Sequence, residues 1–272
     1  MLEYLKAVLF GIIEGITEWL PVSSTGHLIL LEEVLHLDVS EEFYELFQVV
    51  IQLGAILAVL LLFFHKLWPF SGKKSEEERK DTWTLWFKVI VAVLPSAVLG
   101  LLFDDFLDAH LYNHIVVALM LILYGVAFLF VEKSEKNDTI SDVHQIDYRT
   151  ALFIGLFQCL SLIPGTSRSG ATILGALLLG VSRSAGAEFS FFLAIPTMLG
   201  ASGLKLLKFL LEGNMPTEQE LMILLIGCVS AFAVSILVIR GLMDFVRKHS
   251  FAPFGVYRIV LGIAVLGWFL LR

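Results

Sequence analysis

Long apolar runs dominate this sequence, and they constrain its fold more than any other feature. Six of them are close to the ~20 residues that a helix needs to cross the hydrocarbon core of a bilayer. They lie at 43–65, 83–103, 113–131, 188–210, 219–239 and 253–271. With 57% hydrophobic and only 17% charged residues, the chain is too apolar for a soluble domain. The sequence therefore predicts an all-α integral membrane protein in which residues 1–272 form a single membrane domain.

Two further apolar regions are interrupted by polar residues and cannot be simple spanning helices. Region 1–36 contains PVSSTGH at 21–27, and region 149–182 contains PGTSRSG at 164–170. Unpaired backbone groups and charges facing lipid at these points would cost several kcal/mol each. We therefore expect two re-entrant helical hairpins that enter the membrane, break and return to the same side.

The two interrupted regions belong to an internal repeat. A shift of 144 residues places Glu14 on Gln158, and the run 23–26 (SSTG) on 167–170 (SRSG). A shift of 146 places Leu53-Gly54 on Leu199-Gly200. Three spanning helices separate the two hairpins, so the copies have opposite orientations in the membrane. This pattern predicts an inverted-topology repeat, with repeat one at about 1–131 and repeat two at about 149–272.

The charges of the connections predict the orientation of the chain. Lys and Arg collect in 66–81 and 240–250, whereas 104–112 contains three aspartates and no Lys or Arg. Basic connections favour the cytoplasmic side, so both termini are expected outside. The first hairpin then enters from the external face and the second from the cytoplasm. The net charge of −7 and the absence of a basic surface argue against binding to nucleic acid.

Two acids lie in the first hairpin, within an otherwise apolar stretch. Glu14 and Glu18 are four residues apart and therefore share one face of a helix. Ionised carboxylates in a membrane are expensive, and two neighbouring ones repel, which favours a bound divalent cation or a shared proton. We interpret the pair as a functional site. The alternative is a helix end at the headgroup level with both acids in water.

The polar run that follows these acids has the features of an anion site. Pro21 ends the preceding helix, Ser23 to Thr25 provide capping hydroxyls, and Gly26 allows a ligand to approach the backbone. If a helix restarts here, its free N–H groups bind anions, and Ser24 and His27 share a face. The alternative is a simple N-cap with a histidine at the headgroup level.

The second polar run, PGTSRSGAT, adds a cation. Arg168 lies between Ser167 and Ser169 in a turn bounded by glycines, ahead of an apolar run. A guanidinium, capping hydroxyls and helix N–H groups together suit a phosphate. The alternative is an arginine that extends to the cytoplasmic headgroups.

If the two hairpin tips meet, Glu14, Glu18, Ser24 and His27 lie opposite Arg168. These side chains are the parts of a phosphate-ester or anhydride hydrolase. Ser24 is the preferred nucleophile, with Glu18 as base or metal ligand and His27 as acid, although direct attack by His27 stays open. The residues expected to bind the substrate phosphates are Ser23, Thr25, Gly26, Ser167, Ser169, Gly170 and Thr172.

A lipid transporter or flippase could also use inverted repeats with broken helices, but it needs no nucleophile, histidine and acid pair in one site. An ion channel is disfavoured, because no ring of repeated charges is visible.

The chain resembles the bacterial undecaprenyl-pyrophosphate phosphatase family, also known for bacitracin resistance. Its signatures are ExxxE followed by PVSSTGH and a later PGxSRSGAT, which stand here at 14–18, 21–27 and 164–172. The resemblance extends to 47–54, 182–183, 188–189 and 253–258, and so spans nearly the whole chain.

This resemblance implies hydrolysis of a C55 polyprenyl pyrophosphate, which recycles the lipid carrier for cell-wall synthesis and confers bacitracin resistance. It also implies a divalent cation, Mg²⁺ or Ca²⁺, held by Glu14 and Glu18. The expected location is the bacterial plasma (inner) membrane, surrounded by its lipids, with the active site open toward the outer face. Whether the chain forms a homodimer is left open.

Overall fold

The computed structural model describes residues 1–133 and 138–270, and within these ranges it contains helices and no strands. One isolated parallel bridge joins Ile140 to Val181. The α-helices are α1 (Leu2–Thr17), α2 (Ser24–Leu35), α3 (Glu41–Leu62), α4 (Phe64–Leu67), α5 (Glu76–Leu111), α6 (His114–Lys133), α7 (Tyr148–Cys159), α8 (Arg168–Leu178), α9 (Arg183–Leu211), α10 (Glu218–Val246) and α11 (Ala252–Leu270). Two short 3-10 turns, η1 (Val143–Gln145) and η2 (Leu160–Leu162), complete the described chain. The predicted all-α fold is confirmed.

Six of these helices are long and apolar enough to cross a membrane. They are α3, the Glu76–Phe103 part of α5, α6, α9, α10 and α11. Each corresponds to one of the six predicted apolar runs, and the protein is therefore a multi-pass membrane protein.

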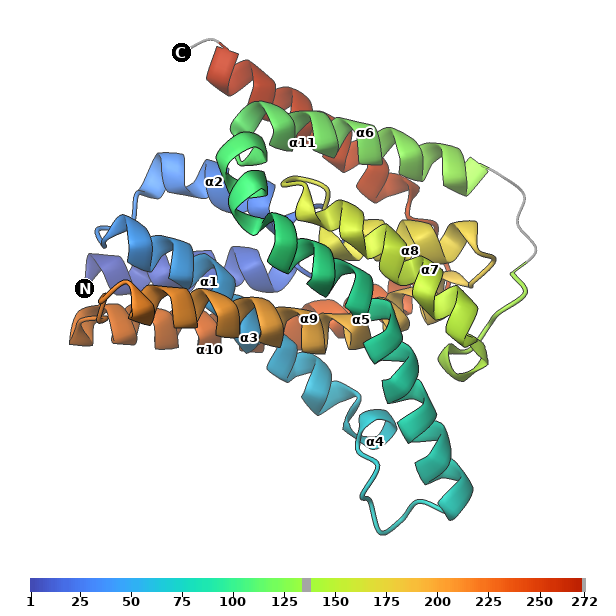
Figure 1. The fold of residues 1–272 in the computed structure, drawn as a ribbon. Helices are drawn as coiled ribbons and strands as arrows, with labels where there is room; N and C mark the ends of the chain where they lie inside the picture. Colours follow the sequence, from blue (N-terminus) through green and yellow to red (C-terminus); the bar gives the residue numbers. More distant parts are fainter. Residues whose placement is uncertain (134–137, 271–272) are drawn as a thin grey trace.

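The two interrupted regions form helical hairpins. In the first, α1 ends at Thr17 and α2 begins at Ser24; in the second, α7 ends at Cys159 and α8 begins at Arg168. At 16, 12, 12 and 11 residues, these helices are shorter than a membrane span. The hairpins approach the centre of the molecule from opposite ends (Figure 1), as expected for an inverted repeat.

The helices of the two halves pack in corresponding ways. Helix α1 lies along α10 as α7 lies along α5, while α3 packs on α9 and α6 on α11. Glycines allow the close approaches: a Cβ at Gly11 would clash with the Gly227 carbonyl, and one at Gly155 with the backbone of Ala92. Small residues at helix contacts of this kind are typical of membrane proteins, because van der Waals packing drives the association of helices there.

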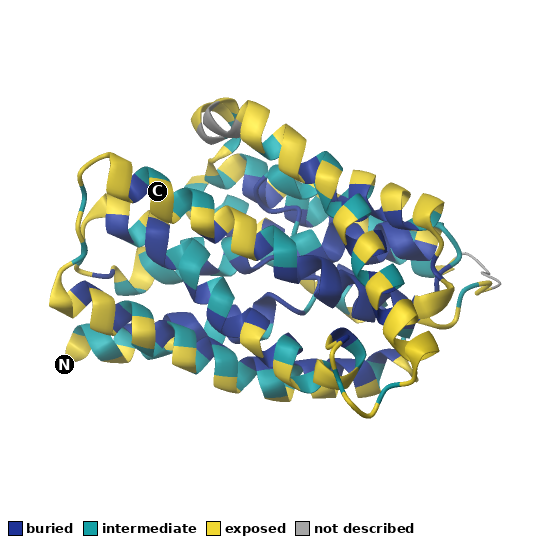
Figure 2. Cartoon of the chain, turned by 60° about the horizontal axis from the view of Figure 1, so that its bottom comes forward, coloured by how far each residue is buried: buried dark blue, intermediate teal, exposed yellow. Residues whose placement is uncertain are grey.

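Burial increases toward the middle of the molecule, where the hairpin tips lie (Figure 2). Aromatic side chains fill much of this centre; for example, the Trp19 and Phe191 rings meet edge-on with centroids 5.3 Å apart. Large apolar side chains also cover the periphery, among them Leu101 and Leu237, each with about two-thirds or more of its surface exposed. An apolar exterior is what a bilayer requires.

The predicted connections at 104–112 and 240–250, where charged residues collect, are shorter in the structure. Helix α5 continues through 104–111, and α10 continues to Val246, so most of the expected connections 104–112 and 240–250 are helical. Charged residues are compatible with a helix once it leaves the hydrocarbon, and they therefore do not mark its end. The side chains of Asp104, Asp105 and Asp108, and residues 134–137 of the predicted cytoplasmic connection, lie outside the described part of the chain.

Candidate active site

The tips of the two hairpins share an unusual backbone conformation. Ser23 and Ser167 have φ of 71° and 72°, which lie in the region that favours glycine. Each is the N-cap of the following helix: the Ser23 hydroxyl accepts from the Gly26 amide at 3.5 Å, and the Ser167 hydroxyl from the Gly170 amide at 3.1 Å. Such backbone strain costs about 1–3 kcal/mol per residue and concentrates at functional sites.

Glu18 joins the two tips. Its Oε2 accepts a hydrogen bond from the Ser24 hydroxyl at 2.9 Å, and its Oε1 accepts one from Arg168 Nη2 at 2.8 Å. The Glu18 and Arg168 side chains are only 7% and 9% exposed, so this ion pair is largely removed from water. The structure thus brings Ser24, Glu18 and Arg168, three of the predicted catalytic residues, into one hydrogen-bonded row, although Glu18 and Arg168 are 150 positions apart in the chain.

The other face of the Arg168 guanidinium is held by α9. Its Nη1 donates to the Ser190 carbonyl at 2.6 Å and to the Ser190 hydroxyl at 3.1 Å. The guanidinium also lies 5.9 Å from the centre of the Trp19 ring. Its Nε is buried without a hydrogen-bond partner, which leaves one strong donor for a ligand.

Of the two predicted phosphate ligands Ser169 and Thr172, Ser169 links the two hairpins, and Thr172 links α8 to α9. The Ser169 hydroxyl lies 3.0 Å from the Glu18 carbonyl oxygen and 3.1 Å from the Ser167 hydroxyl. The Thr172 hydroxyl is 2.9 Å from the Arg168 carbonyl oxygen and 2.7 Å from the Ser190 hydroxyl. Ser169 therefore helps to join the two tips, and Thr172 supports Ser190, which binds the Arg168 guanidinium.

The two glycines and Thr25 lie around the helix starts. A Cβ at Gly26 would come within 3.2 Å of Leu121, and one at Gly170 within 3.1 Å of an Arg258 nitrogen. Thr25 is half-buried in the first turn of α2.

His27 is not hydrogen-bonded to the other predicted catalytic residues. Its Nδ1 lies 2.7 Å from the Ser23 carbonyl, and its Nε2 lies 2.7 Å from the Tyr257 hydroxyl. Because a carbonyl only accepts, Nδ1 carries the proton, and in the neutral ring Nε2 accepts from the tyrosine. The two rings are parallel, with centroids 5.6 Å apart. His27 thus braces the strained Ser23 from the side of α11.

Glu14 is the least satisfied group of the site. It is completely buried, one helical turn before Glu18, and neither of its carboxyl oxygens has a hydrogen-bond partner. A carboxylate in this position needs a proton or a cation. Among residues 1–133 and 138–270, no cluster of three or more His, Cys, Asp or Glu could hold a metal ion by itself.

The repeat shows how Glu14 comes to be unpartnered. Its counterpart Gln158 is equally buried, but its Nε2 donates to Ser96 Oγ at 2.7 Å and to Thr197 Oγ1 at 3.2 Å. When the glycine contacts of α10 and α5 are aligned, Ala231 stands where Ser96 stands in the other half, and the shift of 146 places Ile51 on Thr197. The first half therefore has an acid, Glu14, where the second half has the amide of Gln158. The two hydroxyls that contact the amide are replaced by apolar side chains beside the acid.

Arg258 of α11 fixes both tips. It is fully buried, and its guanidinium donates to the carbonyls of Pro21 at 3.0 Å, Gly165 at 2.9 Å and Thr166 at 2.9 Å. The first of these carbonyls belongs to the first tip and the other two belong to the second. A buried charge is tolerated when its donors are all satisfied, and here it holds the two loops together.

The chain is similar in sequence to known proteins over nearly its whole length. The sequence profile of the family described as "Bacitracin resistance protein BacA" matches residues 7–264. The chain belongs to the BacA family. It is 57% identical over 267 residues to an undecaprenyl-diphosphatase of Enterococcus faecalis, covering 97% of both chains. It is also 57% identical over 271 residues to "Undecaprenyl-diphosphatase 1" of Clostridioides difficile, covering 100% of this chain and 98% of that one. A Streptococcus thermophilus undecaprenyl-diphosphatase is 55% identical over 268 residues, covering 98% of this chain and 93% of the relative.

In this BacA-family chain, the tips combine the groups that phosphoryl transfer requires. The Ser24 hydroxyl is hydrogen-bonded to the Glu18 carboxylate, which can take its proton. Arg168 has a buried Nε donor without a hydrogen-bond partner. Helices α2 and α8 both begin here, so their first N–H groups contribute partial positive charge. The arrangement can bind a phosphate and direct an oxygen nucleophile at it.

Three residues of the site were not identified from the sequence: Ser190, Tyr257 and Arg258. Ser190 is one of many serines, and no local pattern distinguishes it. Arg258 had a usable signal, because an arginine inside the apolar run 253–271 must find partners within the membrane. Tyr257 precedes it in the same run and contacts His27 only through the tertiary fold.

Proposed function

We propose that this protein hydrolyses undecaprenyl pyrophosphate to undecaprenyl phosphate and inorganic phosphate. The observation that carries the proposal is the buried row Ser24–Glu18–Arg168 at the junction of the two hairpins. The relatives named undecaprenyl-diphosphatase support the substrate. The reaction would regenerate the lipid carrier for cell-wall synthesis, and the BacA family's name supports a role in bacitracin resistance.

Binding of the pyrophosphate would use donors of the second tip. The terminal phosphate would take the open Nε of Arg168 and share its Nη2 with Glu18, while Nη1 stays on Ser190. The start of α8 lies at the same place and supplies backbone N–H groups. Because Ser190 holds the guanidinium and is itself hydrogen-bonded to Thr172, little reorganisation is needed when charge develops on the phosphoryl group.

The reaction would proceed in two steps. The Ser24 oxygen attacks the terminal phosphorus as its proton passes to Glu18, the bridging P–O bond breaks, and undecaprenyl phosphate leaves with the electron pair of that bond. Glu18 then passes this proton to the departing undecaprenyl phosphate or to solvent. Water attacks the phosphoserine as Glu18 takes one of its protons, the Ser24 O–P bond breaks with its electron pair on the Ser24 oxygen, and Glu18 returns the proton to that oxygen, so that inorganic phosphate and free Ser24 result. Arg168 stabilises the phosphoryl charge in both steps.

The contacts of His27 favour Ser24 over His27 as the nucleophile. Attack by Nε2 would first require the loss of its hydrogen bond to Tyr257, whereas the Ser24 hydroxyl already has its base at 2.9 Å. As an acid for the leaving lipid phosphate, His27 would have to gain a proton on Nε2 and turn its contact with Tyr257 into a donated bond. The present contacts of His27 support a role in which its ring positions the Ser23–Ser24 turn.

The unpartnered carboxyl of Glu14 fits a divalent cation. Glu14 and Glu18 would hold Mg²⁺ or Ca²⁺, and phosphate oxygens and water would complete its coordination, as is usual for Mg²⁺ at phosphate sites. Such a cation would offset the negative charge of the pyrophosphate in a low-dielectric site.

For the plasma membrane, we propose an orientation with both termini outside and the site reached from the outer face. The support is the distribution of charge. The connection between α3 and α5, together with the first five residues of α5, contains Lys66, Lys73, Lys74, Arg79 and Lys80. Lys66 is within 2.6 Å of Glu188, near the start of α9, which belongs to the same side.

Purified protein in detergent should release inorganic phosphate from undecaprenyl pyrophosphate, as a colorimetric phosphate assay would record. A transporter of the same fold would move the lipid between leaflets of a vesicle and release none. Lipid movement without phosphate release by the pure protein would exclude the phosphatase.

Removal of divalent cations should abolish hydrolysis, and re-addition of Mg²⁺ or Ca²⁺ should restore it, because the Glu14/Glu18 pair needs a counter-charge. In Glu14→Gln, the Mg²⁺ concentration for half-maximal rate should rise about tenfold or more, equivalent to the loss of about 1.4 kcal/mol of binding. Titration of chelated protein with Mg²⁺ measures both effects.

The matched control is Glu41→Gln, which changes an exposed acid in the first turn of α3 and should leave the Mg²⁺ titration unchanged. Full activity of the unmodified protein in excess chelator would show instead that the two acids share a proton or act as base.

A further inference from the structure

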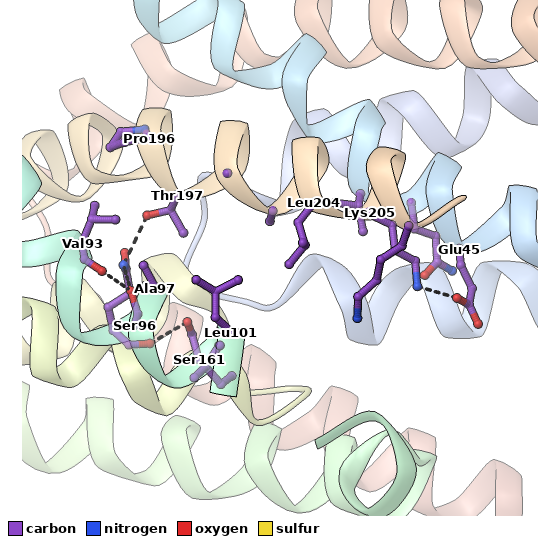
Figure 3. A pocket seen from close by; sticks show the side chains of 18 of the residues that line it. Glu45, Val93, Ser96, Ala97, Leu101, Ser161, Pro196, Thr197, Leu204 and Lys205 are labelled. Carbon is purple, nitrogen blue, oxygen red and sulfur yellow. Dashed lines mark hydrogen bonds and ion pairs between the residues drawn. The ribbon is translucent and has the colours of Figure 1, made fainter. Parts of the chain in front are cut away.

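A cavity lies apart from the hairpin tips, between α3, α5, α7 and α9 (Figure 3). Its volume is about 640 Å³, within the range of about 300–1,000 Å³ that ligand sites occupy. None of Glu14, Glu18, Ser24 or Arg168 lines it. The cavity extends from Ser96 and Thr197 at one end to Glu45 and Lys205 at the other, where those two side chains form an ion pair of 2.5 Å.

The cavity exists because the two halves of the repeat pack differently at one point. A Cβ at Gly54 of α3 would clash with the backbone of Cys228 in α10, so these helices touch. At the corresponding Gly200 of α9, a Cβ would meet nothing within 4 Å. Helix α5, the counterpart of α10, thus stands away from α9 at this level. The second half opens where the first is closed.

The end of the cavity at Ser96 and Thr197 offers no hydrogen-bond donor to a phosphate. The Ser96 hydroxyl lies 3.0 Å from the Val93 carbonyl oxygen, and that of Thr197 lies 2.8 Å from the Leu193 carbonyl oxygen. Both hydroxyls therefore donate to the backbone, and both accept from Gln158 Nε2, whose Oε1 is a buried acceptor without a partner. An acceptor without donors repels an anion, so this end is not a second phosphate site.

Between its two ends, the cavity is lined mainly by apolar side chains, and part of this lining belongs to the second hairpin. Val93, Ala97 and Leu101 of α5 face Leu204 of α9 across the space (Figure 3). Leu162, also in the lining, precedes Arg168 by six residues in the same hairpin.

Helix α9 links the two places as well. Thr197 lies seven residues after Ser190, which holds Arg168, and this spacing is about 10 Å along a helix. A chain attached to a phosphate at Arg168 would therefore lie close to this cavity along both the second hairpin and α9.

We propose that this cavity binds isoprene units of the polyprenyl chain whose pyrophosphate lies at the hairpin tips. The inference rests on the proposed function. The apolar walls of the cavity fit a hydrocarbon chain, and its end at Ser96 and Thr197 excludes the pyrophosphate. This end is also the one nearer to Arg168 along α9. Selection for a long chain would then reside in α5 and α9, apart from the residues that perform the chemistry.

Two glycines of α9 provide a matched test. Gly200 lines the cavity, whereas Gly203, three residues on, is exposed and does not line it, and a Cβ at either position meets nothing within 4 Å. Gly200→Leu should lower kcat/KM for undecaprenyl pyrophosphate about tenfold or more, the usual effect of steric exclusion from an apolar pocket. Hydrolysis of a C5 pyrophosphate, too short to reach the cavity, should stay within about twofold. Gly203→Leu should change neither rate.

A binding measurement gives an answer that does not depend on turnover. A polyprenyl phosphate with a diazirine in its second isoprene unit should label 93–101 of α5 or 196–204 of α9 in the unmodified protein and in Gly203→Leu, but not in Gly200→Leu. Excess unlabelled polyprenyl phosphate should compete, and phosphatidylglycerol should not.

Labelling elsewhere, or equal competition by the phospholipid, would overturn the proposal, as would equal losses with the C55 and C5 substrates. Failure of the unmodified protein to hydrolyse either substrate would count against the proposed function, while the labelling pattern would still report on the cavity.

Discussion

In Arg168→Lys protein, kcat/KM for undecaprenyl pyrophosphate is expected to fall by at least about 100-fold, the effect of losing one or more preorganised donors at a developing charge. The guanidinium uses its planar shape fully: Nη1 is on Ser190, Nη2 is on Glu18, and Nε is open. An ammonium at this position keeps the charge but cannot bridge α9 and Glu18 while it faces a phosphate. Initial rates of phosphate release over a range of substrate concentrations measure the change.

A second arginine provides the control for this substitution. Arg183 donates from Nε to both Glu132 oxygens, at 3.0 and 3.1 Å, at the start of α9 and away from the hairpin tips. Arg183→Lys should weaken that ion pair without a comparable loss of turnover. If Arg168→Lys hydrolyses the substrate at a near-normal rate, Arg168 does not bind the reacting phosphate.

The hairpins could be predicted because their sequence conflicts with the solvent. Pro21 and the hydroxyls after it, and Pro164 with Arg168, cannot face lipid, whatever the rest of the fold does. The capping role of Ser23 and Ser167 followed from the same runs. Their positive φ did not, because left-handed backbone at a serine is imposed by the tertiary contacts around it and not by local preference.

The meeting of Glu18 and Arg168 followed from the repeat, which placed both on tips that enter from opposite sides. The contacts of His27 could not be foreseen in this way. Ser24 and His27 share a helix face in the sequence, but the ring turns to Tyr257 on α11, and helix periodicity says nothing about that neighbour. The cavity at Gly200 was equally hidden, because the same Leu-Gly pair at 53–54 packs tightly in the other half.

Ser24→Ala should lower kcat by at least about 1,000-fold, since loss of a nucleophile removes the covalent route and leaves only binding and charge stabilisation. The Ser24 hydroxyl donates a hydrogen bond to the Glu18 carboxylate at 2.9 Å. Alanine fits the first turn of α2, so the fold should be retained. Phosphate release under saturating substrate measures the effect.

A buried serine elsewhere in the membrane region tests whether the loss of any such hydroxyl has this effect. Ser202 of α9 is 2% exposed and donates to the Val49 carbonyl at 3.0 Å, far along the helix from Ser190. Ser202→Ala removes one buried hydrogen bond, which contributes about 1 kcal/mol to stability, and should turn over normally. Thermal unfolding of both variants in detergent separates lost stability from lost chemistry.

The intermediate decides between serine and histidine. A reaction stopped with acid at an early time should yield protein phosphorylated on the peptide that contains Ser24, because phosphoserine survives acid and phosphohistidine does not. His27→Ala should still form this species, more slowly, since the ring supports the Ser23–Ser24 turn from the Tyr257 side and does not contact Glu18. If the trapped phosphate is acid-labile, or if His27→Ala is inert while Ser24→Ala retains a substantial fraction of turnover, then His27 is the nucleophile. In that case its hydrogen bond to Tyr257 must break when the lipid binds, and the ring must turn toward Arg168 before phosphoryl transfer begins.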